Sequence, residues 1–120
     1  MVPSDVAPPA PGLVVVSRHR VDLDEAKAAL AVLARQRGCL NATIARSTDD
    51  YDLLVIVTEW DSVRSYRKAL SSYEVKVESV PLLATAFDET TAFEVLYRQD
   101  ATGVIEREGA LVEKPQRIPD

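Results

Sequence analysis

Four side chains of this sequence could act on a small molecule: one histidine and three aromatic residues. His19 is the only histidine among 120 residues, and imidazole is the side chain whose ordinary pKa lies nearest neutrality. We therefore expect His19 to be a general base, unless it is a partly buried histidine bonded to a neighbouring group. Trp60, Tyr66 and Tyr73 could line the substrate-binding site, since an indole N–H or a phenol O–H can position a substrate oxygen, although core packing would also explain each.

No metal site is expected, and we expect no cofactor. Cys39 is the single cysteine, and with only one histidine there is no zinc-binding spacing. Asp49, Asp50 and Asp52 lack the glycine and the closing glutamate of a calcium-binding EF-hand loop, so they are interpreted as turn residues. Cys39 is interpreted as a small buried hydrophobic residue.

Composition restricts the class of partner and the compartment. A formal net charge of -5 and a pI near 4.9 argue against a nucleic-acid partner, which would need clustered basic residues. No apolar stretch is long enough for a membrane helix, and residues 1–12 do not resemble a signal peptide, so we expect a cytoplasmic protein without membrane contact. Residues 1–12 are expected to be a flexible extension, 13–98 one domain and 99–120 a tail.

The candidate residues need strands and helices to position them. Alternating apolar residues predict strands at 13–21, 39–47 and 91–98, and five consecutive aliphatic residues within 53–60 predict a central strand buried on both faces. On the first strand, His19 is expected to face the helices together with Val15 and Val21.

Helix signals fall between these strands. Asp22 is expected to cap a first helix, and Asp61 or Ser62 a second. A third helical segment at 73–80 is favoured by a capping box from Ser71 to Glu74, with Pro81 interrupting it and a connector at 82–89. The order strand, helix, strand, strand, helix, strand predicts an α+β, ferredoxin-like βαββαβ fold with a four-stranded antiparallel sheet.

The predicted sheet carries helices on one face only, because crossover connections are right-handed. The other face would hold aliphatic residues such as Val14, Val16 and Val95. If they stayed exposed to water, several kcal/mol of hydrophobic stabilisation would be lost. We therefore expect a homodimer that pairs these faces. Arg18 and Arg20 lie on that face, so we expect them to pair with carboxylates, Glu59 or Glu94, and to specify the dimer.

Three segments give the sequence a family resemblance. The Val-Thr-Glu-Trp-Asp end of the central strand (57–61), the Val-Arg-Ser-Tyr start of the next helix (63–66) and the Phe-Glu-Val-Leu closing strand (93–96) resemble the antibiotic biosynthesis monooxygenase superfamily of dimeric α+β barrels. The resemblance implies a pocket in each subunit between the sheet and the second helical segment. In some members such a pocket oxidises phenols or quinols without metal or flavin, using a base, a dry cavity and donors for an oxyanion.

The resemblance leaves three functional alternatives. The first is cofactor-independent monooxygenation of a small aromatic phenol, quinol or polyketide-like compound, with His19 as base. The second is a non-catalytic small-molecule-binding or interaction dimer of the same fold. The third is a haem binder, which is disfavoured because the asparagine, tryptophan and iron-ligating histidine of the haem-degrading branch fall on His19, Ala69 and Ser79 here.

Overall fold

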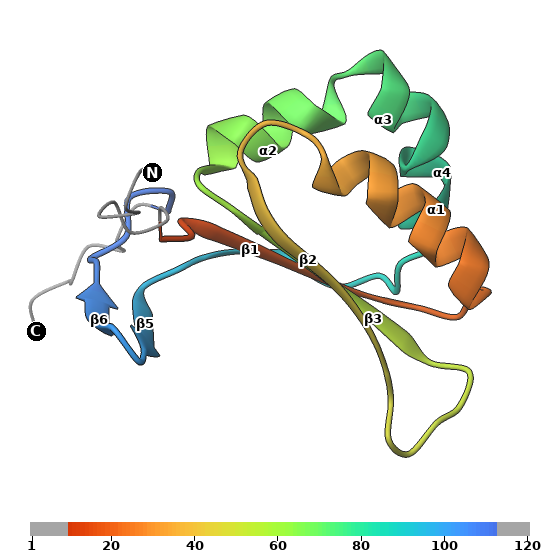
Figure 1. Ribbon diagram of the computed structural model, residues 1–120, viewed down its shortest axis with the longest axis horizontal. Helices are drawn as coiled ribbons and strands as arrows, with labels where there is room; N and C mark the ends of the chain where they lie inside the picture. The colour runs from red at the N-terminus through yellow and green to blue at the C-terminus, as the bar shows by residue number, and fades with distance from the viewer. Residues whose placement is uncertain (1–9, 113–120) are drawn as a thin grey trace, which may run out of the picture.

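The computed structural model describes residues 10–112, which form a four-stranded antiparallel sheet with helices on one face (Figure 1). The sheet order is β2-β3-β1-β4, and β5 and β6 form a separate two-stranded ribbon. This is the α+β, ferredoxin-like fold expected from the sequence. The elements are, in chain order, β1 (Leu13–His19), α1 (Leu23–Ala34), β2 (Cys39–Arg46), β3 (Leu54–Trp60), α2 (Val63–Leu70), α3 (Tyr73–Glu78), α4 (Val80–Leu83), β4 (Ala92–Glu94), β5 (Tyr97–Asp100) and β6 (Gly103–Glu106).

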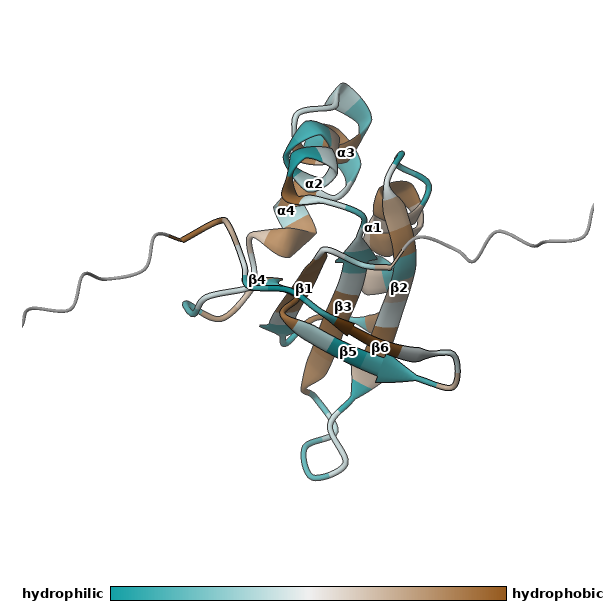
Figure 2. Cartoon of the chain, turned by 90° about the vertical axis from the view of Figure 1, so that its left-hand side faces the viewer, coloured by the Kyte–Doolittle hydropathy of each residue, from teal (hydrophilic) through white to brown (hydrophobic). Residues whose placement is uncertain are grey.

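The two central strands bury one face each. On β1 and β3 every second side chain is buried beneath the helices, and the intervening side chains are mostly half-buried. Figure 2 shows the helices gathered on one side of the sheet, with apolar residues concentrated in the central strands and α1. Within a single chain β3 is therefore fully buried on its helix face only. The buried residues of the two strands are Leu13, Val15, Ser17, His19, Leu54, Ile56, Thr58 and Trp60.

Local hydrogen bonds fix where the helices begin. The Asp22 carboxylate accepts the N–H groups of residues 24 and 25 at 3.0 and 3.3 Å, and Ser62 caps α2, both as expected. The cap of α3 is Ser72, so the prediction of Ser71 was wrong. Ser71 instead donates to the carbonyl of Arg67 at 3.0 Å and completes the end of α2. Pro81 lies in the first turn of α4, where its missing N–H costs nothing.

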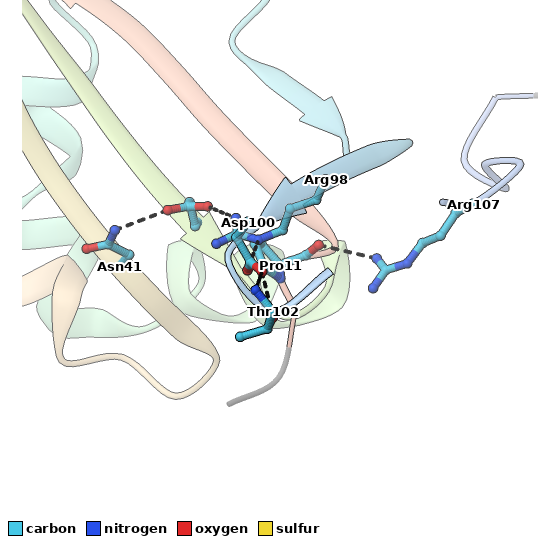
Figure 3. A network of polar contacts seen from close by, with 7 residues as sticks. Pro11, Asn41, Arg98, Asp100, Thr102 and Arg107 are labelled. Carbon is cyan, nitrogen blue, oxygen red and sulfur yellow. Dashed lines mark hydrogen bonds and ion pairs between the residues drawn. The ribbon is translucent and has the colours of Figure 1, made fainter. Parts of the chain in front are cut away.

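The strand expected at 91–98 divides in two. Residues 92–94 pair with β1, after which the chain leaves the sheet and pairs with β6. Asp100 accepts the N–H of Thr102 at 2.8 Å, and Gly103 adopts a φ of 140°, which makes the turn of the ribbon. Arg98 donates to Glu59 at 3.0 Å, which ties this ribbon to the sheet. Figure 3 shows Arg98 beside Asp100 within this polar network. The segment from 99 onward, expected to be an aperiodic tail, thus contributes an ordered strand.

Two arginines on the open sheet face form ion pairs with partners other than those expected. Arg18 binds Glu89 through two bonds of 2.8 Å, and Arg20 binds Asp50 at 2.8 Å. These bonds raise the pKa of both guanidinium groups and lower the pKa of both carboxyl groups. The two carboxylates predicted as partners bind other donors. Glu59 accepts from Asn41 and Arg98, and Glu94 accepts the backbone N–H of Ala110.

No helix among residues 10–112 has the length and apolar character needed to cross a membrane. Residues 1–9 of the expected extension and 113–120 of the expected tail lie outside the described residues.

Candidate functional site

His19 ends β1 on the helix-facing side and has no exposed surface. Its Nε2 lies 2.6 Å from the Ser17 hydroxyl, and its Nδ1 lies 3.0 Å from the Thr85 hydroxyl. The Thr85 hydroxyl in turn donates to the carbonyl of Leu82 at 2.6 Å. Two tautomers satisfy both ring nitrogens. In one, Nδ1–H donates to Thr85 and the Ser17 hydroxyl donates to Nε2; in the other, Nε2–H donates to Ser17 and the Thr85 hydroxyl can donate to Nδ1.

Burial lowers the pKa of His19, because the imidazolium would lose its hydration and no carboxylate bonds to either ring nitrogen. The ring is therefore neutral at neutral pH, and both of its nitrogens are satisfied by hydroxyl groups. A neutral imidazole is the protonation state that a general base requires.

A groove of about 400 Å³ lies between α1 and the α3–α4 segment, and we refer to it as the α1–α4 groove. Much of its wall is apolar, and its polar side chains are Glu25, Glu78 and Thr85. Thr85 is thus shared between the groove and the buried His19 cluster. The groove has a size and lining suited to a small, largely apolar molecule.

The three aromatic candidates lie away from this groove. Trp60 is fully buried, donates Nε1–H to Thr58 at 2.8 Å, and packs on Tyr66 with ring centroids 5.3 Å apart. Burial raises the pKa of Tyr66. Tyr73 begins α3 and is 75% exposed.

Trp60 and His19 lie at opposite ends of the β1–β3 pair. Trp60 pairs with Leu13, and His19 pairs with Leu54. The six steps along β1 from Leu13 to His19 correspond to about 20 Å of strand. In this chain the structure brings Trp60 and Tyr66 together, but it does not gather the four sequence candidates around one cavity.

Two residues of the His19 cluster were not singled out from the sequence. Ser17 shares a strand face with His19, two residues earlier, and that alternation was the available signal. Thr85 lies in the segment expected to be a connector. Pro81 could have indicated its position, because proline favours the first turn of a helix. A proline there predicts a helical turn that ends near Thr85.

The described residues do not fit the haem-degrading arrangement. Ser79, at the position of the iron-ligating histidine, is buried and donates to the carbonyl of Ala29 at 2.7 Å. Both nitrogens of His19 are engaged by hydroxyl groups. Among residues 10–112 no three His, Cys, Asp or Glu side chains cluster in a way that could hold a metal ion.

The sheet order and the helices on one face define a ferredoxin-like α+β domain, in which the buried His19 lies beside a groove. The sequence profile of the family described as antibiotic biosynthesis monooxygenase matches residues 22–77. The sequence match and the fold both make the chain similar to the antibiotic biosynthesis monooxygenase superfamily. No curated protein sequence matches the chain significantly.

Solved structures share this fold. SnoaB, a cofactor-independent oxygenase from Streptomyces nogalater, is 24% identical with a TM-score of 0.59, over 77% of this chain and 98% of its own. A putative antibiotic biosynthesis monooxygenase from Chloroflexus aurantiacus is 25% identical with a TM-score of 0.51, over 70% and 92% of the two chains. A conserved protein from Methanosarcina mazei is 18% identical with a TM-score of 0.56, also over 70% and 92%.

Proposed function

We propose that this protein catalyses the cofactor-independent oxygenation of a small aromatic phenol, quinol or polyketide-like compound. The observation that carries the proposal is the neutral, buried His19, bonded to a hydroxyl in the wall of the α1–α4 groove. The description of SnoaB as a cofactor-independent oxygenase supports the same reaction class.

The chemistry requires a base and a largely dry site. Removal of a phenolic proton gives an electron-rich anion, which can pass electrons to dioxygen without metal or flavin. One oxygen atom becomes a carbonyl on the ring and the other leaves as water, so the substrate supplies all the electrons. His19 takes up the proton, and the apolar part of the groove wall contacts the aromatic ring.

Oxygen uptake with a panel of quinols and anthrones tests this proposal. We expect turnover by the wild-type protein and loss of at least about 100-fold in His19→Ala, the scale of general base catalysis. Lys76→Ala, a change on the exposed surface of α3, is the control and should match the wild type. No uptake with any compound, or equal uptake by His19→Ala, would reject the proposal.

The same assay tests the aromatic residues predicted from the sequence. Trp60→Phe, Tyr66→Phe and Tyr73→Phe each remove one polar group while retaining a ring. Because none of the three lines the α1–α4 groove, we expect their KM values to stay within about twofold of wild type if that groove is the site. A large rise in KM for Tyr66→Phe would instead move the site to the Trp60 end of the sheet.

A non-catalytic ligand-binding dimer is the second candidate function. It is favoured by the saturation of both His19 nitrogens, which is also the arrangement of a purely structural histidine. This alternative predicts that quinols bind, by calorimetry, without oxygen uptake.

We also propose that the protein is a cytoplasmic homodimer. On the face of the sheet opposite the helices, Val14, Val16, Val55 and Val57 are only half-buried and Phe93 is 46% exposed. Covering this face with a second copy would remove several aliphatic side chains from water. Cys39 is the only cysteine, so the chain cannot form an internal disulfide. A free thiol is compatible with the reducing conditions of the cytoplasm.

Light scattering after size exclusion tests the homodimer. We expect a dimer for the wild type and a monomer for Val57→Lys, which places a charge in the middle of the open face. Ala31→Lys adds the same charge to the exposed side of α1 and should remain dimeric. A monomeric wild type, or a dimeric Val57→Lys, would contradict the proposed interface.

A further inference from the structure

His19 has no exposed surface, so a substrate in the α1–α4 groove cannot touch its ring directly. The ring has two side-chain hydrogen-bond partners. Ser17 lies on the same strand and is itself buried, whereas Thr85 is exposed and lines the groove. Thr85 is therefore the polar contact between the base and the groove.

We propose that the Thr85 hydroxyl is a proton relay, which accepts the proton of a substrate hydroxyl in the groove and passes its own proton to His19. This inference rests on the proposed function and deepens it by adding a residue to the site. It also defines the substrate class, because the relay serves a neutral molecule whose acidic group is a hydroxyl.

The hydrogen-bond distances permit this transfer. The Thr85 hydroxyl lies within hydrogen-bond distance of two acceptors, the carbonyl of Leu82 at 2.6 Å and His19 Nδ1, when that nitrogen carries no proton, at 3.0 Å. When a substrate hydroxyl donates to Thr85, rotation about the Thr85 C–O bond turns its proton toward Nδ1. The relay uses the tautomer in which Nε2–H donates to Ser17, whose hydroxyl can rotate to accept it.

The transfer balances in protons and charge. The substrate O–H bond breaks as a new O–H bond forms on Thr85, and the original Thr85 proton forms the Nδ1–H bond. The products are a substrate oxyanion and an imidazolium whose two N–H groups donate to Thr85 and Ser17. No further acceptor is needed to satisfy the charged ring.

The Thr85 backbone is held independently of its side chain. Its N–H donates to the carbonyl of Leu82 at 3.0 Å, and two residues later the N–H of Phe87 donates to the carbonyl of Arg18 at 3.0 Å. Thr85→Val keeps the branched shape and these backbone bonds but removes the hydroxyl. Thr85→Ser keeps the hydroxyl and is the matched control.

The experiment uses para-nitrophenol, which is not expected to be oxidised and whose absorbance reports ionisation. At a slightly acidic pH the free probe is mostly protonated. We expect the wild type and Thr85→Ser to increase the ionised fraction of bound probe, and Thr85→Val to bind it without ionising it. Because His19 is the only histidine, its imidazole nitrogen NMR signals should show protonation on probe binding in the first two proteins and not in the third.

With an oxidisable quinol, we expect Thr85→Val to lower kcat by about 100-fold with little change in KM, and Thr85→Ser to restore most of it. Equal ionisation by Thr85→Val, or a wild type that fails to bind or ionise the probe, would overturn the relay. Ionisation of the probe without oxygen uptake from any quinol would support the relay and reject the oxygenase proposal, so the two can fail separately.

Discussion

Lowering the pH below 6.5 should destabilise this protein through one side chain, His19. The folded state buries the ring and lowers its pKa from the ordinary value of 6.5, so protonation favours the unfolded chain. The contribution is complete above pH 6.5 and is lost as the pH falls towards the folded-state pKa. One proton taken up on unfolding corresponds to at most about 1.4 kcal/mol per pH unit.

The carboxyl groups whose pKa the fold lowers act in a more acidic range. The pKa values of Glu89 and Asp50 are lowered from ordinary values of 4.5 and 3.8 by their arginine partners, so their contributions are lost only below those values. Between pH 6.5 and about 5, the change in the free energy of unfolding therefore comes from His19. Across it we expect a total loss of at most about 2 kcal/mol.

Urea unfolding at several pH values, at one fixed protein concentration, measures this loss. Trp60 is the only tryptophan and is fully buried, so its fluorescence reports unfolding. We expect the free energy of unfolding to fall with pH in the wild type and in Ser17→Ala, and to stay level in His19→Gln. A level wild-type profile, or the same slope in His19→Gln, would refute the assignment of a neutral buried imidazole.

Two further predictions concern packing. Gly38→Ala should lower the free energy of unfolding by more than about 2 kcal/mol, because its φ is 93° and a Cβ there would lie 2.4 Å from that of Ser65. Thermal unfolding should show partial recovery in the double variant with Ser65→Gly, and additive losses would argue against the contact. Ser79→Ala should cost about 1 to 2 kcal/mol through its buried 2.7 Å bond to the carbonyl of Ala29, and a neutral result in urea unfolding would show that bond to be dispensable.

Short-range patterns predicted most of the fold. The alternation along β1 placed Ser17 and His19 correctly on the buried face, because strand geometry alone sets that period. The alternation at 91–98 continued unchanged through the point where the chain leaves the sheet, since a local pattern does not specify the strand with which a segment pairs. Two adjacent serines likewise left the cap of α3 undetermined until the end of α2 was known.

The site was predicted less completely because its contacts are long-range. The bond from His19 to Thr85 spans 66 residues, and the bonds from Arg18 to Glu89 span 71. No periodicity in the sequence connects such positions. The residue type identified His19 as the candidate base. Thr85, which connects His19 to the groove, could be identified only from the folded structure.

The position of β1 in the sheet also constrains how the chain can fold. β1 lies between β3 and β4, and Leu13 pairs with Trp60 on one side and with Glu94 on the other. Because β1 precedes both of its neighbours in the chain, it can complete its pairing only after they are synthesised, whereas β2 and β3 can form their hairpin from nearby residues. Until residue 94 has been synthesised, the valines of β1 lack a complete sheet, which makes this strand the segment most dependent on protection from premature association.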